Sequence, residues 1–207
     1  MKILVSLLFL NSVFFITKLS GQEVIAMLSR THRLSAGANA GFISYTSPRL
    51  HTNTETGFGY GMFIQYGFNH RVAASFSYQH FAIKSQDGLE RVVNSPYPYN
   101  DLSLTGKYFF GSTTTKLRPN LAIVINYTKS KENNQYTSTY LSHETFSGLS
   151  FGGGGGLSYF VDPQVSIDIS ILYNTGTYTT NYQDGFIVDF TYKFSSIKGF
   201  AGVSYHF

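Results

Sequence analysis

The sequence predicts an all-β fold, an eight-stranded antiparallel up-and-down transmembrane β-barrel, and three observations carry this prediction. Aromatic residues make up 17% of the 207 residues and charged residues only 13%, and the 20 glycines are mixed with aromatic and β-branched residues. Apolar residues alternate with small or polar residues in several successive segments, which is typical of strands. The connections between these segments alternate between long and short. Cysteine is absent, so a disulfide framework, a thiolate metal site and a cysteine nucleophile are excluded.

Residues 1–21 are predicted to be a cleaved signal peptide that precedes a barrel domain over residues 22–207. Lys2 is followed by an apolar stretch from Ile3 to Ile16 and then by small and polar residues up to Gly21, which is the layout of a secretory signal. At about 14 residues the apolar stretch is shorter than the ~20 residues that a spanning helix needs. A retained amphipathic anchor is the alternative.

The net charge gives no indication of a nucleic-acid partner. The whole chain has 15 Lys and Arg against 11 Asp and Glu, a net charge of +4. Lys2 and Lys18 lie in the predicted signal peptide, so the barrel domain keeps a net charge of only +2. Without a cluster of basic residues, this small excess is not the electrostatic footprint of a nucleic-acid-binding protein.

The eight strands are predicted from alternation with a period of two. In the segment GFGYGMFIQYGF, from Gly57 to Phe68, aromatic and aliphatic residues occupy one face and mostly glycine the other. The same alternation recurs at residues 72–83, 102–110, 121–127 and 165–173. The predicted strands lie near residues 34–45, 57–68, 71–83, 101–110, 119–128, 147–160, 165–175 and 186–207.

The last of these strands is the least regular. Phe186 to Phe194 and Phe200 to Phe207 form two alternating segments, separated by Ser195 to Gly199. Two separate strands would make nine, and an odd number is disfavoured in single-chain bacterial barrels. We therefore predict one long strand interrupted by a bulge. A ten-stranded barrel that recruits Glu23 to Arg30 is the alternative.

The apolar faces are predicted to contact lipid rather than fill the lumen. A soluble barrel has an apolar lumen and a polar outside, whereas a membrane barrel inverts this arrangement. Several apolar faces carry aromatic residues near one end, such as Tyr66 with Phe68 and Tyr108 with Phe110, as interfacial girdles require. The opposite faces hold glycine, serine, threonine and asparagine with few charges, which would be a poor water-facing surface.

The lengths of the connections support the membrane interpretation. The long connections cover residues 46–56, 84–100, 129–146 and 176–185, and the short ones are centred on residues 69–70, 112–118 and 162–164. Short periplasmic turns and long external loops are typical of outer-membrane barrels, with both ends of the barrel chain on the periplasmic side.

Three segments give the chain a resemblance to a known family. They are GFAGVSYHF at residues 199–207, DLSLTGKYFFG at residues 101–111 and LSYFVDPQVSIDISILYNTG at residues 157–176. The chain resembles the outer-membrane-protein β-barrel family, which includes OmpX, the OmpA transmembrane domain and the PorT-like barrels. The resemblance covers the predicted barrel domain and implies the fold and an outer-membrane location, not an activity. It also implies that Val203, Tyr205 and Phe207 are the signal read by the barrel-assembly machinery; alternatively, they only face lipid.

The glycine run from Gly152 to Gly156 invites comparison with a phosphate-binding loop. Such loops continue into Lys-Ser or Lys-Thr, whereas this run continues into Leu157, Ser158 and Tyr159 as part of a strand. Glycine is therefore expected to permit curvature or close packing in a small barrel.

No catalytic, metal or cofactor site is predicted. The histidines His32, His51, His70, His80, His143 and His206 lack the spacing of metal ligands. Ser142, His143 and Glu144 offer a nucleophile, a base and an orienting acid in an external loop, as a lipid A-modifying enzyme would need. A triad is recognised by geometry rather than adjacency, so this activity is kept only as an alternative.

Four charged residues occupy strand positions that are predicted to face the lumen, and they are Lys107, Asp168, Asp189 and Lys193. Unpaired burial of a charge is costly, so we expect an internal polar network of ion pairs. A narrow ion channel is the alternative. Eight strands leave an interior that side chains nearly fill, which makes a wide pore incompatible with this strand number.

The external loops are the predicted functional surface, since loops on a rigid scaffold commonly carry recognition. Tyr97, Tyr99, Tyr136 and Tyr140 are the candidate recognition residues, because tyrosine supplies contact area at low entropic cost. Tyrosine also suits the membrane interface. The sequence thus predicts a structural or surface-interaction barrel whose partners are outer-membrane lipid, lipopolysaccharide and an unknown surface partner.

Overall fold

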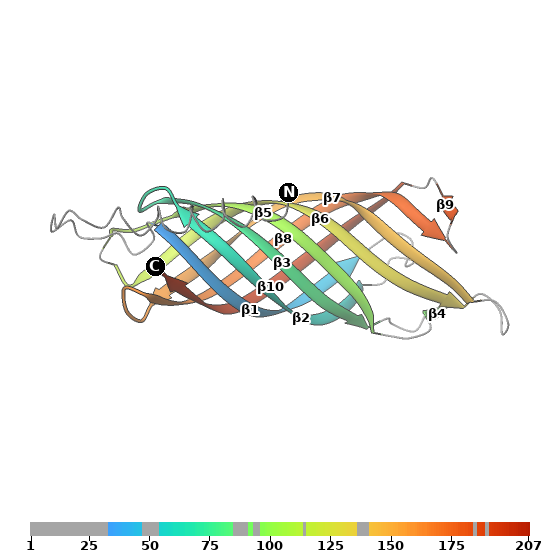
Figure 1. Ribbon diagram of the computed structural model, residues 1–207, viewed down its shortest axis with the longest axis horizontal. Helices are drawn as coiled ribbons and strands as arrows, with labels where there is room; N and C mark the ends of the chain where they lie inside the picture. Colours follow the sequence, from blue (N-terminus) through green and yellow to red (C-terminus); the bar gives the residue numbers. More distant parts are fainter. Residues whose placement is uncertain are drawn as a thin grey trace, which may run out of the picture.

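Eight long strands form a closed antiparallel barrel in the computed structural model (Figure 1). They are β1 (Arg33–Thr46), β2 (Thr54–Gly67), β3 (Val72–Lys84), β5 (Tyr97–Phe109), β6 (Leu117–Gln135), β7 (Leu141–Phe160), β8 (Val165–Gln183) and β10 (Tyr192–His206). The structure describes residues 33–46, 54–84, 91–92, 96–113, 115–135, 141–183, 186–188 and 191–207. The predicted signal peptide and the segment Glu23 to Arg30 lie outside the described residues. The predicted fold class is confirmed.

The barrel closes by pairing its first and last long strands. β1 runs antiparallel to β10 in register from Ser35 opposite His206 to Thr46 opposite Ser195. The short turns, the start of β1 and the end of β10 lie together at one end of the barrel, on the left of Figure 1. We call this the periplasmic end and the other the extracellular end. Among the described residues, no helix is long and apolar enough to cross a membrane.

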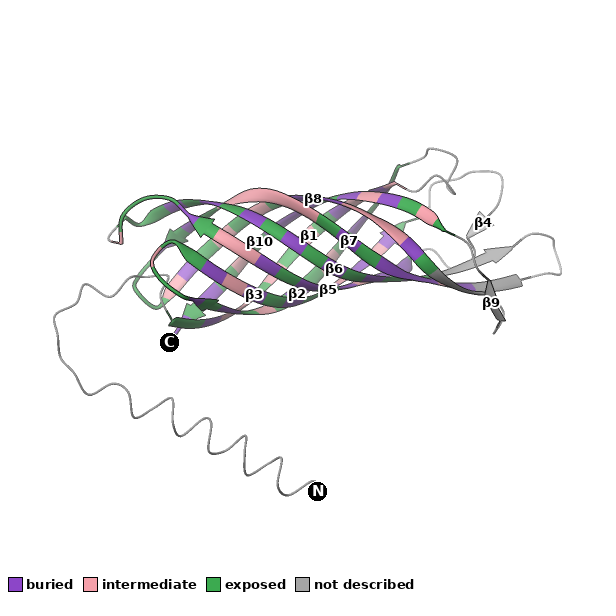
Figure 2. Cartoon of the chain, turned by 90° about the horizontal axis from the view of Figure 1, so that it is seen from above, coloured by how far each residue is buried: buried purple, intermediate pink, exposed green. Residues whose placement is uncertain are grey.

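Burial alternates along much of the described part of the long strands, as the stripes in Figure 2 show. Large apolar side chains project outward, with Phe58 78% and Ile123 73% exposed. Serine, threonine, asparagine and glutamine occupy many inward positions, including Gln65, Ser77 and Asn126. The predicted inversion of a soluble barrel is therefore confirmed, since a surface this apolar needs lipid rather than water around it.

The final strand differs from the prediction. β10 pairs without interruption with both β8 and β1 through Ser195 to Gly199, so the predicted bulge is absent. Phe186–Val188 forms a separate short strand, β9, which pairs with β8. The prediction placed Lys193 in the lumen and Val203 on the lipid face, and this change of parity requires a bulge. It was wrong because Lys193 faces outward and Phe194 faces the lumen, so alternation continues along the strand.

Three neighbouring strands extend beyond the rest at the extracellular end. β6, β7 and β8 have 19, 20 and 19 residues, whereas the other long strands have 13 to 15. Their outer parts, residues 129–135, 141–147 and 177–183, continue to pair there. Two short strands join this extension, β4 (Arg91–Val92) against β6 and β9 against β8. We call these five segments the protruding sheet, which lies on the right in Figure 1.

The glycine run lies within β7 and brings this strand close to β8. A Cβ atom on Gly154 would overlap the backbone carbonyl oxygen of Ile171, and one on Gly152 would overlap that of Tyr173. Gly155, at an outward position, is less crowded, because its Cβ would lie 3.3 Å from the Asn120 carbonyl oxygen. The inward glycines therefore permit close backbone approach in a small barrel.

Candidate functional site

The extracellular half of the lumen is filled by aromatic side chains. These buried residues, here called the aromatic plug, are Tyr45, Phe81, Tyr99, Phe146, Tyr178, Phe194 and Phe200. The rings of Tyr178 and Phe194 stack with centroids 4.3 Å apart, and the Tyr45 and Tyr99 rings meet edge to face at 5.4 Å. The hydroxyl groups of Tyr45 and Tyr178 form a hydrogen bond of 3.0 Å. This half of the barrel is thus packed like a protein core.

A buried ion pair lies beside the plug. Lys198 on β10 pairs with Asp101 on β5, and both side chains are almost completely excluded from solvent. Thr128 donates a hydrogen bond of 2.6 Å to the other Asp101 carboxylate oxygen. The Lys198 ammonium also lies 5.5 Å from the centroid of the Tyr99 ring. These contacts compensate for the loss of hydration that burial of two charges entails. Lys198 was not predicted as a lumen residue, because it lies in the segment interpreted as a bulge.

Two of the four candidate recognition tyrosines are inside the barrel. Tyr97 and Tyr99 belong to β5 and are 2% and 0% exposed. The Tyr97 hydroxyl donates to the Glu55 carboxylate of β2. Their assignment to an external loop was therefore wrong, because β5 begins earlier than the period-two pattern indicated. Tyr136 and Tyr140 lie outside the described residues.

The periplasmic half of the lumen is polar. Asp168 accepts hydrogen bonds from the hydroxyl groups of Ser158, Ser166 and Ser204, that from Ser166 at 3.1 Å. Ser166 is also 2.9 Å from Nε2 of His206. Lys107 and Asp168 line a cavity of about 70 Å³ in this half. Polar lining of this kind suits water molecules rather than a large ligand.

The other two charged residues predicted to face the lumen do not join this group. Lys193 is exposed on the outward face of β10, so the prediction that it faces the lumen was wrong. Its neighbour Phe194 faces inward, so alternation along β10 turns Lys193 outward. Asp189 lies outside the described residues.

Arg118 closes the periplasmic end. This buried side chain on β6 donates a hydrogen bond of 3.3 Å to the carbonyl oxygen of Phe110 and another to that of His70. Its guanidinium also lies 5.4 Å from the centroid of the Phe109 ring. The residue therefore ties two periplasmic turns to one strand. Arg118 could not be recognised from the sequence, because a single arginine in a turn region carries no distinctive pattern.

The predicted assembly signal lies on the outward face at the periplasmic end. Val203, Tyr205 and Phe207 are 55%, 45% and 63% exposed, and the rings of Tyr205 and Phe207 are 5.1 Å apart. The backbone N–H of Phe207 donates to the carbonyl oxygen of Leu34 at 2.9 Å, which extends the seam between β10 and β1. Recognition of these residues by the assembly machinery stays a prediction.

The residues considered for lipid modification fall within β7. Glu144 is 2% exposed and lies inside the barrel. The side chains of Ser142 and His143 lie outside the described residues. The one described member of this group is therefore turned away from the surface that a lipid substrate would reach.

Comparisons with known proteins agree with this architecture. Residues 20–207 match the family described as outer membrane protein beta-barrel domain. Neisserial surface protein A is 18% identical with a TM-score of 0.60, and the match covers 84% of this chain and 97% of that one. OprG from Pseudomonas aeruginosa is 15% identical with a TM-score of 0.51, and the match covers 86% and 98%. Ail, the attachment invasion locus protein of Yersinia pestis, is 14% identical with a TM-score of 0.50, and the match covers 84% and 99%.

At these identities the likeness to solved structures shows the fold alone. A comparison with curated proteins finds no match. The family match extends over the whole barrel, from β1 to β10. The chain therefore belongs to the outer-membrane β-barrel family and lies in the outer membrane.

Proposed function

We propose that the protein is a surface-interaction barrel that presents its protruding sheet to an extracellular partner. The observation that carries this proposal is the difference in strand length around the barrel. A tilted membrane strand needs ~9–11 residues to cross. The 19 or 20 residues of β6, β7 and β8 leave a long extension outside the membrane.

The extension is large enough to be a recognition surface. Eight extra residues per strand, at ~3.3 Å each and a tilt of ~40°, correspond to roughly 20 Å of projection. The short strands β4 and β9 pair with β6 and β8 within this sheet. Continued backbone pairing makes the sheet more rigid than a free loop, and a rigid surface loses less conformational entropy when it binds.

The lumen supports binding rather than conduction as the main role. The aromatic plug fills the extracellular half, and the Asp101–Lys198 ion pair lies beside it. Eight-stranded barrels in general have interiors that side chains fill. The outer surface and the protruding sheet therefore carry the interaction.

Shortening of the β6–β7 hairpin tests the proposal. Residues 133–143 are replaced by an Asn-Gly turn, which joins the paired positions Glu132 and Glu144. Cells of a Gram-negative host that display either protein are compared for adhesion to epithelial monolayers, immobilised glycans and serum proteins. We expect the full-length protein to increase adhesion to at least one of these surfaces and the shortened protein to lose that increase.

A second loop provides the matched control. Residues 47–53, which connect β1 and β2 outside the protruding sheet, are replaced by the same turn. This variant should keep the adhesion of the full-length protein. The proposal is wrong if the full-length protein adheres no better than empty cells to any surface, or if the hairpin variant adheres as well as the full-length protein.

A further inference from the structure

Charged side chains are distributed unevenly between the two faces of the barrel. Among the described side chains of the long strands, the carboxylates all face the lumen, and they are Glu55, Asp101, Glu144 and Asp168. Near the extracellular ends of the long strands, the described outward charges are all lysines, and they are Lys84, Lys129, Lys131 and Lys193. Among the described side chains, those on the outside of the barrel at this end thus carry only positive charge.

The lysines lie at the level of the outer lipid headgroups. On β3, Lys84 is 12 residues from Val72, and on β6, Lys129 is 12 residues from Leu117. Val72 and Leu117 are the first residues of these strands at the periplasmic end. At ~3.3 Å per residue and a tilt of ~40°, these separations correspond to roughly 25–30 Å along the barrel axis, about the height of the apolar band of such barrels. A cation at that height faces anionic headgroups, not acyl chains.

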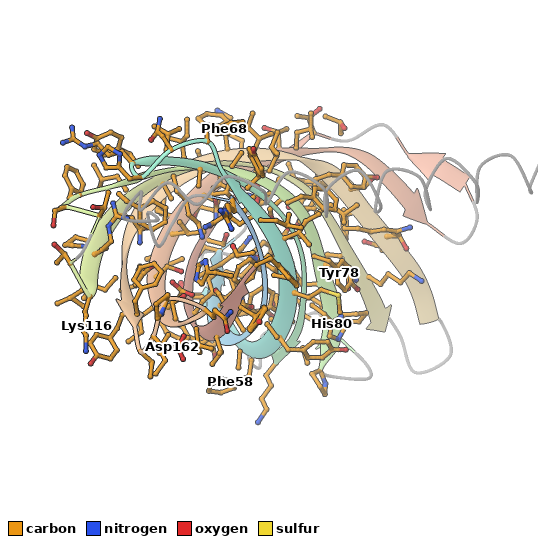
Figure 3. All side chains as sticks on the ribbon, turned by 60° about the vertical axis from the view of Figure 1, so that its left-hand side comes forward. Phe58, Phe68, Tyr78, His80, Lys116 and Asp162 are labelled. Carbon is orange, nitrogen blue, oxygen red and sulfur yellow. The ribbon has the colours of Figure 1, made fainter. Side chains whose placement is uncertain are left out.

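One lysine has hydrogen-bond donors beside it. Lys129 on β6 is directly opposite Asn100 on β5, which is opposite His80 on β3. The Tyr78 hydroxyl donates to Asn100 Oδ1 at 2.8 Å, and His80 Nδ1 lies 2.8 Å from the same oxygen. Tyr78 and His80 lie next to each other on the outside of the barrel (Figure 3).

These contacts determine which Asn100 atoms remain available. Because Oδ1 accepts both hydrogen bonds, the amide orientation is set and Nδ2 is left without a bond to a described residue. Directly opposite residues have Cβ atoms ~4.5–5.5 Å apart. The Asn100 amide and the Lys129 ammonium can therefore reach the same oxyanion, and charge-assisted hydrogen bonds of this kind are the stronger class.

An apolar surface continues below these donors toward the membrane centre. The outward side chains of Leu104, Ile125 and Tyr127 are 58%, 60% and 46% exposed on the same two strands. A lipid whose headgroup contacts Lys129 would lay its acyl chains along them. The surface therefore matches a phosphorylated lipid in both its polar and its apolar part.

We propose that the outward face of β3, β5 and β6 binds lipid A, with a glucosamine phosphate held by Lys129 and Asn100 and the acyl chains over Ile125 and Leu104. A sugar monophosphate carries more negative charge than a phosphodiester, so it gains more from the Lys129 ammonium group and the Asn100 amide. This site is on the side of the barrel, separate from the protruding sheet.

Lipid binding to the purified full barrel in detergent, measured by native mass spectrometry, tests the proposal. The probes are bisphosphorylated lipid A, dephosphorylated lipid A and phosphatidylglycerol. We expect Lys129→Gln to weaken binding of bisphosphorylated lipid A about fivefold, the effect of one surface charge-assisted hydrogen bond, and Asn100→Ala to weaken it less. Lys116→Gln is the matched control, since it removes an exposed lysine at the periplasmic end.

The outcomes distinguish a lipid A site from nonspecific binding of lipids. Selective weakening by Lys129→Gln, together with weaker binding of both other probes to the native barrel, supports a lipid A site. Equal effects of Lys129→Gln and Lys116→Gln, or equal affinity for phosphatidylglycerol or dephosphorylated lipid A, overturn it. A heat-dependent gel shift of each variant shows that it is folded before binding is compared.

Discussion

Gly154 lies where β7 comes closest to β8, and its position can be tested with a single methyl group. A Cβ atom there would overlap the backbone of Ile171, and the backbone cannot rotate away as a side chain could. Gly155, the next residue, has an outward position with more room. Gly154 and Gly155 are adjacent in the same strand and differ only in the face that they occupy, so they form a matched pair.

We expect Gly154→Ala to lower the free energy of unfolding by about 1–3 kcal/mol, as overpacking does. Gly155→Ala should change it much less. Urea-induced unfolding in lipid vesicles, followed by tyrosine fluorescence, measures both variants. Equal stability of the two variants would show that the close approach of β7 and β8 does not need glycine.

The Asp101–Lys198 ion pair allows a second test at the same scale. Asp101→Ala leaves the Lys198 ammonium buried beside an aromatic ring without its carboxylate. Removal of one partner of a buried pair typically costs about 3–5 kcal/mol. We expect a loss of this size in the free energy of unfolding. Lys193→Met, which removes an exposed outward lysine from the same strand, is the control and should be close to neutral.

The double variant Asp101→Leu with Lys198→Met completes the experiment. It removes both charges and keeps the shape of each side chain, branched at Cγ in leucine and unbranched in methionine, so it should recover most of the lost stability. If the double variant is as unstable as Asp101→Ala, the loss comes from packing rather than from an uncompensated charge.

At the scale of the element, β10 both closes the barrel and carries the predicted assembly signal. Phe207 contacts Tyr205 on the outward face and donates a backbone hydrogen bond to Leu34 of β1. Phe207→Ala keeps that backbone bond but removes the aromatic ring. We expect the variant to reach the outer membrane of cells at a clearly reduced level, as judged by the heat-shifted folded fraction.

Refolding of the purified variant separates recognition from stability. If Phe207→Ala refolds from urea into detergent as well as the native chain does, the loss in cells comes from the assembly step. A variant that fails equally in both settings would contradict the role of Phe207 as a signal.

The strand positions within the membrane could be predicted from sequence, and the reason is local. Between Gly57 and Phe68 the outside is lipid and the inside is polar, so hydrophobicity distinguishes the two faces. In the extracellular half both faces are apolar, because the aromatic plug fills the lumen. The hydrophobicity of Phe194 and Phe200 therefore could not show whether these side chains face lipid or the lumen. For the same reason Lys193 was assigned to the wrong face.

The ends of the strands were predicted too short for a related reason. β6 was predicted to end near residue 128 and β8 near residue 175, but they continue to Gln135 and Gln183. Beyond the membrane both faces of a strand meet water, so the polar residues there do not alternate with apolar ones. Backbone pairing with β7 continues without that pattern.

At the scale of the whole molecule, the filled lumen predicts that the barrel does not conduct ions. The native barrel in a planar lipid bilayer should show no discrete conductance steps, because the aromatic plug and the Asp101–Lys198 pair occupy the path. A porin added to the same chamber serves as the positive control. Stable openings of the native barrel over a range of voltages would contradict a sealed interior and favour the narrow-channel alternative.

The seam between β1 and β10 has a consequence for the order of events during biogenesis. Ser35 meets His206, so the seam joins positions near opposite ends of the barrel domain. Until that seam forms, two strands keep unpaired backbone groups, and hydrocarbon does not tolerate them. Contacts this distant in sequence also form slowly. Stable insertion must therefore follow synthesis of the last strand, and before that point the chain depends on protection from aggregation in the periplasm.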